Sequence, residues 1–328
     1  MKSSENAIEL KNLSKYFKVY KKQPGFVGSL KGLFKREYNT VKAVDDVSFD
    51  IKQGELVGFI GPNGAGKTTT LKMCSGLLYP TAGSVEVLGF TPFKRKPEYL
   101  KQISLIMGQK NQLWWDLPAI ETFELNRQIY DIPKDEYQKT LDDLVDMLEV
   151  REILNQQVRK LSLGQRMKCE LIAALLHRPK VLFLDEPTIG LDIVMQKRIR
   201  KFIKEYNQKY NATVILTSHY MDDVKEICDR VIIINKGRLV YDGGIAELIK
   251  KHADYKILTV ITNGKILKKD VEKYGDVAKI DEHRFTLNVK RSDVSKVAGD
   301  VLKAFDVDDL DINEPKLEDI VEGIFSRD

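Results

Sequence analysis

The sequence contains few cysteines, and they lie far apart. Of its 328 residues only Cys74, Cys169 and Cys228 are cysteine, and no two of them form a CxxC pair. Secreted domains that depend on disulfides usually carry an even number of cysteines at close spacings. We therefore exclude a disulfide-stapled fold and predict three reduced thiols in a cytosolic protein.

Long apolar runs are also missing. The longest, at residues 171–176 and 231–234, are far shorter than the roughly 20 residues that a membrane-spanning helix requires. The N-terminal segment contains Lys2, Glu5 and Glu9 and no apolar stretch, which is unlike a secretory signal. The sequence thus predicts a chain that does not cross a bilayer and carries no secretory signal.

An excess of positive charge is confined to one short segment. The formal net charge is +5, and residues 18–42 alone hold seven cations and one anion. The remainder is about neutral, so the charge balance gives no indication of nucleic-acid binding. Hydrophobic residues make up 43% of the chain and charged residues 31%, as in globular proteins, and the length suits about two domains of roughly 100–250 residues.

Short apolar strands alternate with helical segments between residues 43 and 242. The segment 47–51 has the period of two that marks a half-buried strand, whereas 55–60 is apolar almost throughout. This alternation predicts an α/β fold with a parallel sheet, and the helical pattern of 118–178 predicts a helical insertion. Further strands are expected at 85–88, 103–107, 181–184, 213–217 and 231–234, and a helix at 68–78.

The pattern changes after Asp242-Gly243-Gly244, and residues 250–328 are expected to form a small separate α+β domain. Strands are predicted at 255–262, 277–280 and 285–289, and a helix at 293–305. The acidic run at 306–311 lacks the glycine that a calcium-binding loop needs at its sixth position. We interpret this run as a solvated acidic surface.

A glycine-rich segment follows the apolar strand 55–60 and opens the predicted helix. It fits the pattern GxxxxGK[ST], in which backbone N–H groups converge on phosphate oxygens and the helix N-terminus adds partial positive charge. Lys67 would reach the β- and γ-phosphates, and the Thr68 hydroxyl would bind Mg²⁺. The predicted phosphate-binding residues are Gly61, Pro62, Asn63, Gly64, Ala65, Gly66, Lys67, Thr68 and Thr69.

Two acidic residues, Asp185 and Glu186, end the apolar strand 181–184. Strand ends of a parallel sheet border the crevice where nucleotides bind. Asp185 would then hold the metal, and Glu186 would accept a proton from the attacking water. Two acids at a strand end are, taken alone, more often a helix cap or a solvated edge, but the upstream phosphate-binding segment favours the catalytic interpretation.

These motifs resemble those of the ABC ATPase cassette, and the resemblance covers about residues 7–245. Leu161-Ser162-Leu163-Gly164-Gln165 is similar to the family's LSGGQ signature, and His219 to its switch histidine. Leu191-Asp192 resembles the D-loop. The resemblance implies nucleotide contacts from Ser162, Gly164, Gln165 and an adenine-stacking Phe17, a catalytic and metal-binding role for the Q-loop glutamine Gln109, and γ-phosphate contact by His219.

Three of these assignments have alternatives. Gln112 competes with Gln109 for the Q-loop position, and Tyr16 lies beside Phe17. A lone histidine after a strand is usually structural, although the spacing from Asp185 favours His219. Leu163 stands where the family usually has glycine, and its effect on the rate is left open.

The resemblance also implies partners. In the family, the signature of one cassette closes over the phosphate loop of another, so ATP sites are shared. The chain is thus expected to pair with another cassette, most simply a second copy of itself, to use ATP and Mg²⁺, and to power an integral-membrane permease. The insertion at 18–40 and the C-terminal domain resemble those of drug-, lipid- and polysaccharide-exporting cassettes, which favours an exporter. Its expected location is the cytoplasmic face of the membrane. The expected domains are a cassette at residues 1–245 and an accessory domain at 250–328.

A basic insertion occupies residues 18–40. Phe26, Leu30, Leu33 and Phe34 follow helical spacing between lysines and Arg36, as in an amphipathic helix that lies on anionic headgroups or on a permease. Gly28 and Gly32 weaken such a helix, and a solvated basic loop is an equal alternative.

Two other functions are compatible with parts of the sequence. One is an ABC ATPase that acts on nucleic acid or the ribosome, but the long coiled-coil insertion and the second cassette of such proteins are missing from the sequence. The other is a P-loop kinase, against which the LSLGQ segment and His219 count. The cargo cannot be named from the sequence.

Overall fold

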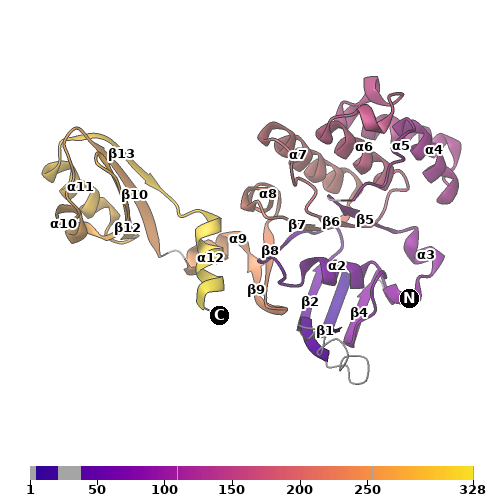
Figure 1. The fold of residues 1–328 in the computed structure, drawn as a ribbon, viewed down its shortest axis with the longest axis horizontal. Coiled ribbons are helices and arrows are strands. Elements are labelled where there is room, and N and C mark those ends of the chain that lie inside the picture. Colours follow the sequence, from indigo (N-terminus) through magenta and orange to yellow (C-terminus); the bar gives the residue numbers. More distant parts are fainter. Residues whose placement is uncertain (1–4, 21–37, 109, 253, 328) are drawn as a thin grey trace, which may run out of the picture. The chain divides into compact units, whose positions relative to one another are not determined.

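The computed structural model describes residues 5–20, 38–108, 110–252 and 254–327. The chain divides into two compact units, the first ending at Gly243 and the second beginning at Gly244, and each is described by itself (Figure 1). Within the described ranges, no helix is both long and apolar enough to span a bilayer.

A six-stranded sheet forms the centre of the first unit, in the order β5-β6-β7-β3-β8-β9. The first five of these pair in parallel. Strands β3, β6 and β7 are buried along their whole length, as expected of parallel strands covered on both faces. The strands are β3 (Leu56–Ile60), β5 (Ile103–Met107), β6 (Val181–Asp185), β7 (Thr213–Thr217), β8 (Arg230–Asn235) and β9 (Arg238–Gly244).

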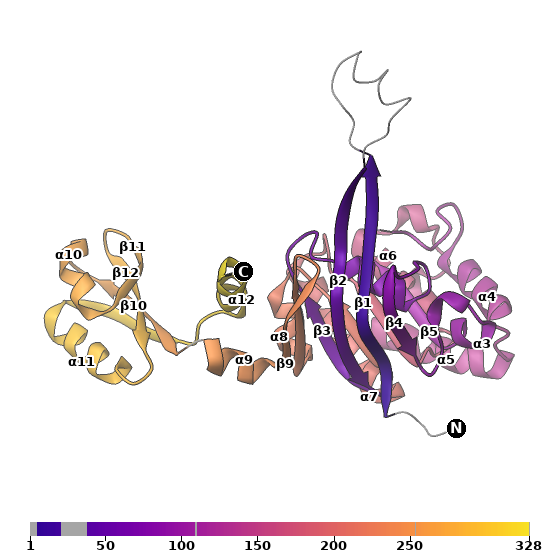
Figure 2. The same ribbon diagram turned by 90° about the horizontal axis from the view of Figure 1, so that it is seen from below.

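A three-stranded antiparallel sheet, in the order β2-β1-β4, lies on one side of the parallel sheet. Its strands are β1 (Asn6–Tyr20), β2 (Tyr38–Lys52) and β4 (Ala82–Val87). β1 and β2 run side by side as a long ladder (Figure 2). Helix α2 (Lys67–Cys74) lies between the two sheets (Figure 1), and buried apolar residues of both sheets and of α2 form one core cluster.

Helices α4 to α8 gather on the opposite side of the parallel sheet (Figure 1), whereas Tyr99 of α3 belongs to the core cluster of the antiparallel sheet and α2. Helix α6 contacts α4, α5 and β5, and α7 contacts α5 and α8. Local sequence fixes where two of them begin: Ser162 and Gln165 form a capping box at α6, and Asp192 caps α7. The helices are α3 (Pro97–Leu100), α4 (Ala119–Ile129), α5 (Lys134–Leu148), α6 (Leu163–Leu175), α7 (Ile193–Tyr210) and α8 (Met221–Ile227), with single 3₁₀ turns at Pro92–Lys94, Arg151–Ile153 and Val158–Lys160.

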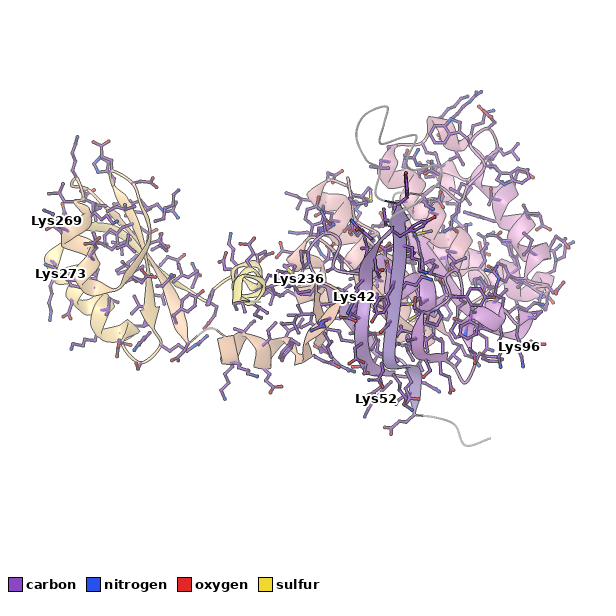
Figure 3. All side chains as sticks on the ribbon, turned by 60° about the horizontal axis from the view of Figure 1, so that its bottom comes forward. Lys42, Lys52, Lys96, Lys236, Lys269 and Lys273 are labelled. Carbon is purple, nitrogen blue, oxygen red and sulfur yellow. The ribbon has the colours of Figure 1, made fainter. Side chains whose placement is uncertain are left out.

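The second unit contains a four-stranded antiparallel sheet in the order β11-β12-β10-β13. Helix α11 packs on β10 and β12 over a small apolar core, and α12 contacts α9. Lys269 of α10 and Lys273 of the following 3₁₀ turn are labelled in Figure 3. The elements are α9 (Ile245–His252), β10 (Tyr255–Thr262), α10 (Lys268–Val271), a 3₁₀ turn (Glu272–Tyr274), β11 (Asp276–Ile280), β12 (Arg284–Lys290), α11 (Val294–Ala304), β13 (Val307–Asn313) and α12 (Leu317–Arg327).

The predicted fold class is confirmed: an α/β unit with a parallel sheet and a helical part, followed by a small α+β unit. Some details differ. The helix expected at 68–78 ends at Cys74, two residues before Gly76, which has a positive φ of 76°. The acidic run is solvated, as expected, but it forms strand β13. Residues 18–20 and 38–40 extend β1 and β2, and the amphipathic helix expected between them lies outside the described residues.

Candidate functional site

The glycine-rich segment forms the loop between β3 and α2. Gly66 caps α2 at a φ of 109°, a left-handed conformation that side chains rarely adopt. At Gly61 a Cβ atom would lie 2.2 Å from the carbonyl oxygen of Ile234 on β8. Glycine is therefore required at both positions for the loop to pass close to β8 and then turn into the helix, whose free N–H groups favour an anion.

Lys67, the first residue of α2, folds back over the loop. Its ammonium nitrogen donates hydrogen bonds to the carbonyl oxygens of Gly61 at 2.6 Å and Pro62 at 3.2 Å. Burial lowers the pKa of Lys67, while the carboxylates of Glu186 and Asp185 raise it. The lysine thus places a cation over the loop, close to both acids.

Asp185 ends β6 and receives a hydroxyl on each carboxylate oxygen. Thr68 donates to Oδ2 at 2.8 Å and Thr217 donates to Oδ1 at 2.7 Å. Thr68 and Asp185 had been predicted, whereas Thr217 had not. Its position at the end of the predicted strand 213–217 was the one signal in the sequence, and the register of β7 against β6 sets it beside Asp185.

Glu186 adopts a strained backbone conformation and contacts His219. Its φ is +56°, in the left-handed region that non-glycine residues enter at a cost of about 1–3 kcal/mol. Its Oε1 lies 2.7 Å from Nε2 of His219, and its backbone N–H donates to the hydroxyl of Thr217 at 3.1 Å. The structure therefore joins two residues that lie 33 positions apart in the sequence.

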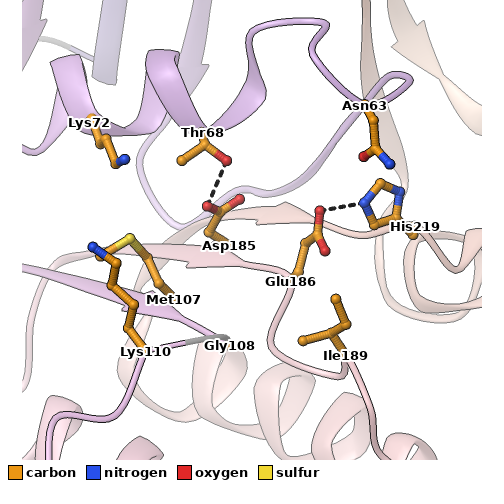
Figure 4. Close-up of a pocket in the computed structure, with 10 residues that line it drawn as sticks. All are labelled: Asn63, Thr68, Lys72, Met107, Gly108, Lys110, Asp185, Glu186, Ile189 and His219. Carbon is orange, nitrogen blue, oxygen red and sulfur yellow. Dashed lines mark hydrogen bonds and ion pairs between the residues drawn. The ribbon is translucent and has the colours of Figure 1, made fainter.

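Four of these side chains, those of Thr68, Asp185, Glu186 and His219, border one cavity of about 430 Å³. The cavity combines the Thr68–Asp185 pair and the Glu186–His219 pair with cationic side chains, as Figure 4 shows. Such a mixture of hydroxyl, carboxylate and ammonium groups suits a phosphate ester and its metal ion. Its lining residues are Asn63, Thr68, Lys72, Met107, Gly108, Lys110, Asp185, Glu186, Ile189 and His219.

The Q-loop is predicted directly after β5, where Gly108 lines the cavity. The N–H of Gly108 donates to the carbonyl oxygen of Asp185 at 2.9 Å, and a Cβ atom at Gly108 would lie 2.1 Å from the carbonyl oxygen of Glu186. Gln109 lies outside the described residues. The alternative, Gln112, has its amide bound to the carbonyl of Leu105 at 3.0 Å, which turns it toward β5.

Phe17 and Tyr16 differ in how they are held on β1. The Tyr16 hydroxyl donates to Asp45 at 2.6 Å, and Lys42, labelled in Figure 3, lies 5.3 Å from its ring centre. The Phe17 ring is 38% exposed. A cation lies near the Phe17 ring as well, with Nζ of Lys15 5.3 Å from its centre, so Phe17 differs from Tyr16 in its greater exposure and in having no hydroxyl to bind Asp45.

The signature residues lie at the start of α6 and are not brought to the cavity: among the described residues that line it, none comes from this segment. The Ser162 hydroxyl accepts from the N–H of Gln165 at 3.2 Å, and Gln165 accepts from the N–H of Ser162 at 2.9 Å. Gly164 packs against Met195, so that a Cβ atom would lie 2.8 Å from its methyl carbon. Ser162 and Gln165 line a separate hollow of about 690 Å³.

The fold and cavity define a class. A glycine-rich loop that enters a helix, a lysine over that loop, and a hydroxyl–carboxylate pair at the end of β6, which β7 separates from β3, are together the site of a P-loop nucleoside-triphosphate-binding protein. The topology agrees, because the loop leaves β3, which lies between β7 and β8 at the centre of the sheet.

Comparisons with known proteins narrow this class. Residues 44–189 match the family described as ABC transporter, and residues 254–313 match the EvrA-like ABC transporter C-terminal domain. The ABC transporter ATP-binding protein NatA of Bacillus subtilis is 36% identical over 215 residues, covering 66% of this chain and 87% of NatA. The bacitracin transport ATP-binding protein BcrA of Bacillus licheniformis is 35% identical, covering 66% and 70%.

A solved structure agrees with these relatives. The chain is 26% identical to a solved ATP-binding subunit of an ABC transporter, with a TM-score of 0.62, covering 75% of this chain and 92% of the other. The chain belongs to the ABC transporter ATP-binding proteins and is the ATP-binding and ATP-hydrolysing subunit of such a transporter. Neither the nucleic-acid or ribosome alternative nor the kinase alternative is favoured by these comparisons.

Proposed function

We propose that this subunit drives export through ATP binding, pairing with a second copy, and hydrolysis in the cavity between α2 and the ends of β6 and β7. The observation that carries this proposal is the Glu186–His219 pair beside the Thr68–Asp185 pair in one cavity. Similarity to BcrA, whose name assigns it to bacitracin transport, supports the transport role.

The nucleotide phosphates would bind the loop of residues 61–69. Lys67 already donates to two loop carbonyls, and it would exchange these bonds for phosphate oxygens. Phe17, with its exposed ring on β1, would stack on the adenine. Because aromatic rings stack on any base, this contact would add affinity more than specificity.

A magnesium ion fits the Thr68–Asp185 pair. The hydroxyl and carboxylate oxygens lie 2.8 Å apart and are the hard ligands that Mg²⁺ prefers, usually one or two from the protein with phosphate oxygens and water completing the shell. When bound, the ion would neutralise phosphate charge. Gln109 remains proposed as a further ligand.

Glu186 would act as the general base. Its carboxylate lies in the cavity within 2.7 Å of His219, so a water between the pair and the phosphate could give up its proton to Oε1 or Oε2. His219 would orient Glu186 through its Nε2–H before the reaction and then donate the same N–H to the transferring phosphate. The pair therefore assigns proton transfer to one residue and charge stabilisation to the other.

The signature would act on a second copy. Ser162, Gly164 and Gln165 lie away from this chain's own cavity, so a complete site needs a partner to supply them. Ile193 and Val194, which start α7, are 70% and 65% exposed. Burying such apolar side chains between two copies would help to hold the dimer.

A permease would bind near the start of the helical part. Trp114 and Trp115 are 57% and 47% exposed, and Leu117 is exposed as well. Exposed tryptophans are frequent at protein interfaces. We propose that this surface holds the protein at the cytoplasmic face of the membrane, and that the 18–40 segment adds membrane contact. In this proposal residues 1–245 act as the cassette and residues 250–328 as an accessory domain.

Replacement of Glu186 by Gln tests the chemistry. The variant should bind Mg-ATP and pair stably but hydrolyse it at less than about a hundredth of the normal rate, since general acid–base catalysis contributes roughly 10²–10⁴-fold. Turnover and size-exclusion profiles with and without Mg-ATP measure both effects. Near-normal hydrolysis would remove Glu186 as the base. A monomer with Mg-ATP would remove the shared site.

A further inference from the structure

A buried ion pair lies behind the cavity, between α7 and α8. Asp223 is fully buried, and the Arg200 side chain is 4% exposed. Nη1 of Arg200 donates to Oδ1 of Asp223 at 2.7 Å. A buried charge destabilises a fold unless its hydrogen-bonding capacity is satisfied. The second carboxylate oxygen of Asp223 must therefore also have partners, and these partners show which segments the ion pair stabilises.

That second oxygen holds two loops. Oδ2 of Asp223 accepts hydrogen bonds from the hydroxyl of Ser218, at 2.6 Å, and from the hydroxyl of Thr188. Both hydroxyl residues are buried. Thr188 follows Glu186 by two residues, and Ser218 directly precedes His219. One carboxylate therefore ties together the two loops that carry the cavity's carboxylate–imidazole pair.

Few other described hydrogen bonds join these loops. The parallel pairing of β6 with β7 ends at Asp185 and Thr217, and beyond it Glu186 turns away at a positive φ. The backbone of Glu186 still bonds to Thr217. Past this point, the Glu186–His219 contact depends on side chains, and Asp223 is the buried group that reaches both loops.

We propose that Asp223, held by Arg200, is a positioning residue that sets the distance between Glu186 and His219 by fixing their loops. This inference rests on the proposed role of Glu186 as the base. Neither Asp223 nor Arg200 lines the cavity. The ion pair acts through Thr188 and Ser218. Loss of this connection should therefore lower the turnover rate and leave the affinity for nucleotide unchanged.

The double substitution Thr188→Val and Ser218→Ala removes both hydroxyl tethers and leaves the ion pair in place. We expect kcat to fall roughly 10- to 100-fold, as small misplacements of catalytic groups do, with little change in KM for ATP. Thr188→Ser keeps a hydroxyl and should retain activity. Glu226→Gln is the matched control, because Glu226 binds the outer side of Arg200 at 2.7 Å and contacts neither hydroxyl; its kcat should be unchanged.

A Glu186→Gln background separates this inference from the proposed function. If the double substitution lowers kcat in the wild-type background but does not lower the residual rate of Glu186→Gln further, positioning through Glu186 is supported. An unchanged kcat with a lower melting temperature would assign Asp223 a structural role only and overturn the inference. An equal fall in both backgrounds would also overturn it. Near-normal turnover of Glu186→Gln alone would instead remove the proposed function.

Discussion

Replacing Thr217 with valine should disturb both acidic residues of the site, the carboxylate of Asp185 and the backbone of Glu186, through one hydroxyl. Thr217 is fully buried at the end of β7. Its hydroxyl donates to Asp185 at 2.7 Å and accepts from the N–H of Glu186 at 3.1 Å. Valine has nearly the same shape, so the substitution removes these two hydrogen bonds without opening a large cavity.

The size of the effect follows from the bond that is lost. A hydrogen bond to a charged group contributes about 1.5–3 kcal/mol, so the free energy of unfolding should fall by about that amount. The N–H of Glu186 keeps a bond to the Thr217 carbonyl at 3.1 Å and adds little to the loss. For a unit of this size each kcal/mol lowers the melting temperature by about 2–4 °C, so we expect a decrease of about 3–12 °C.

Turnover should fall as well. If about 1.4 kcal/mol of the lost interaction is also missing in the transition state, the rate decreases about tenfold. Thr213→Val is the matched control on the same strand. Its hydroxyl accepts from the N–H of Gly54 at 2.9 Å, so we expect a loss of about 1 kcal/mol in stability and normal hydrolysis. Thermal unfolding and steady-state ATPase assays measure both quantities, and equal ATPase rates in the two variants would refute the assigned role of Thr217.

Two further predictions concern Gly108 and His177. Gly108→Ala places a Cβ atom 2.1 Å from the carbonyl oxygen of Glu186, so hydrolysis should fall about tenfold or more while ATP binding persists; normal turnover in a steady-state assay would contradict this. Burial lowers the pKa of His177 to about 4, below the 6.5 expected in the unfolded chain. The unfolded state thus binds the extra proton between these values, and the free energy of unfolding should decrease as the pH falls from 6.5 to 4. His177→Phe should flatten this dependence in thermal unfolding measured at several pH values, and an unchanged slope would exclude His177 as its source.

The parallel sheet and the phosphate-binding loop were predictable because their causes are local. Apolar runs such as 181–184 form strands buried on both faces, and the spacing of glycines and Lys67 fixes a loop that enters a helix. Three of the four strands of the second unit were found for the same reason: the alternating residues of 285–289, for example, place Phe285, Leu287 and Val289 in its core.

Features that depend on pairing between distant segments were not predictable in this way. Thr217 has no motif of its own, and only the register of β6 against β7 sets it beside Asp185. Strand β13 was missed because it is mostly exposed and carries three aspartates among its seven residues, and its pairing with β10 decides its conformation. The roles of Ser162 and Phe17 remain predictions, because their expected partners are a second chain and a nucleotide.

Contact between α9 and α12 has a consequence for how the second unit is completed during synthesis. Helix α9 opens this unit, while α12 follows all four strands of its sheet. Leu248 of α9 and Val321 of α12 are both buried. The apolar side of α9 is therefore fully buried only after α12 has been synthesised. A chain truncated after β13 would keep all four strands but would leave the apolar side of α9 exposed and prone to aggregation.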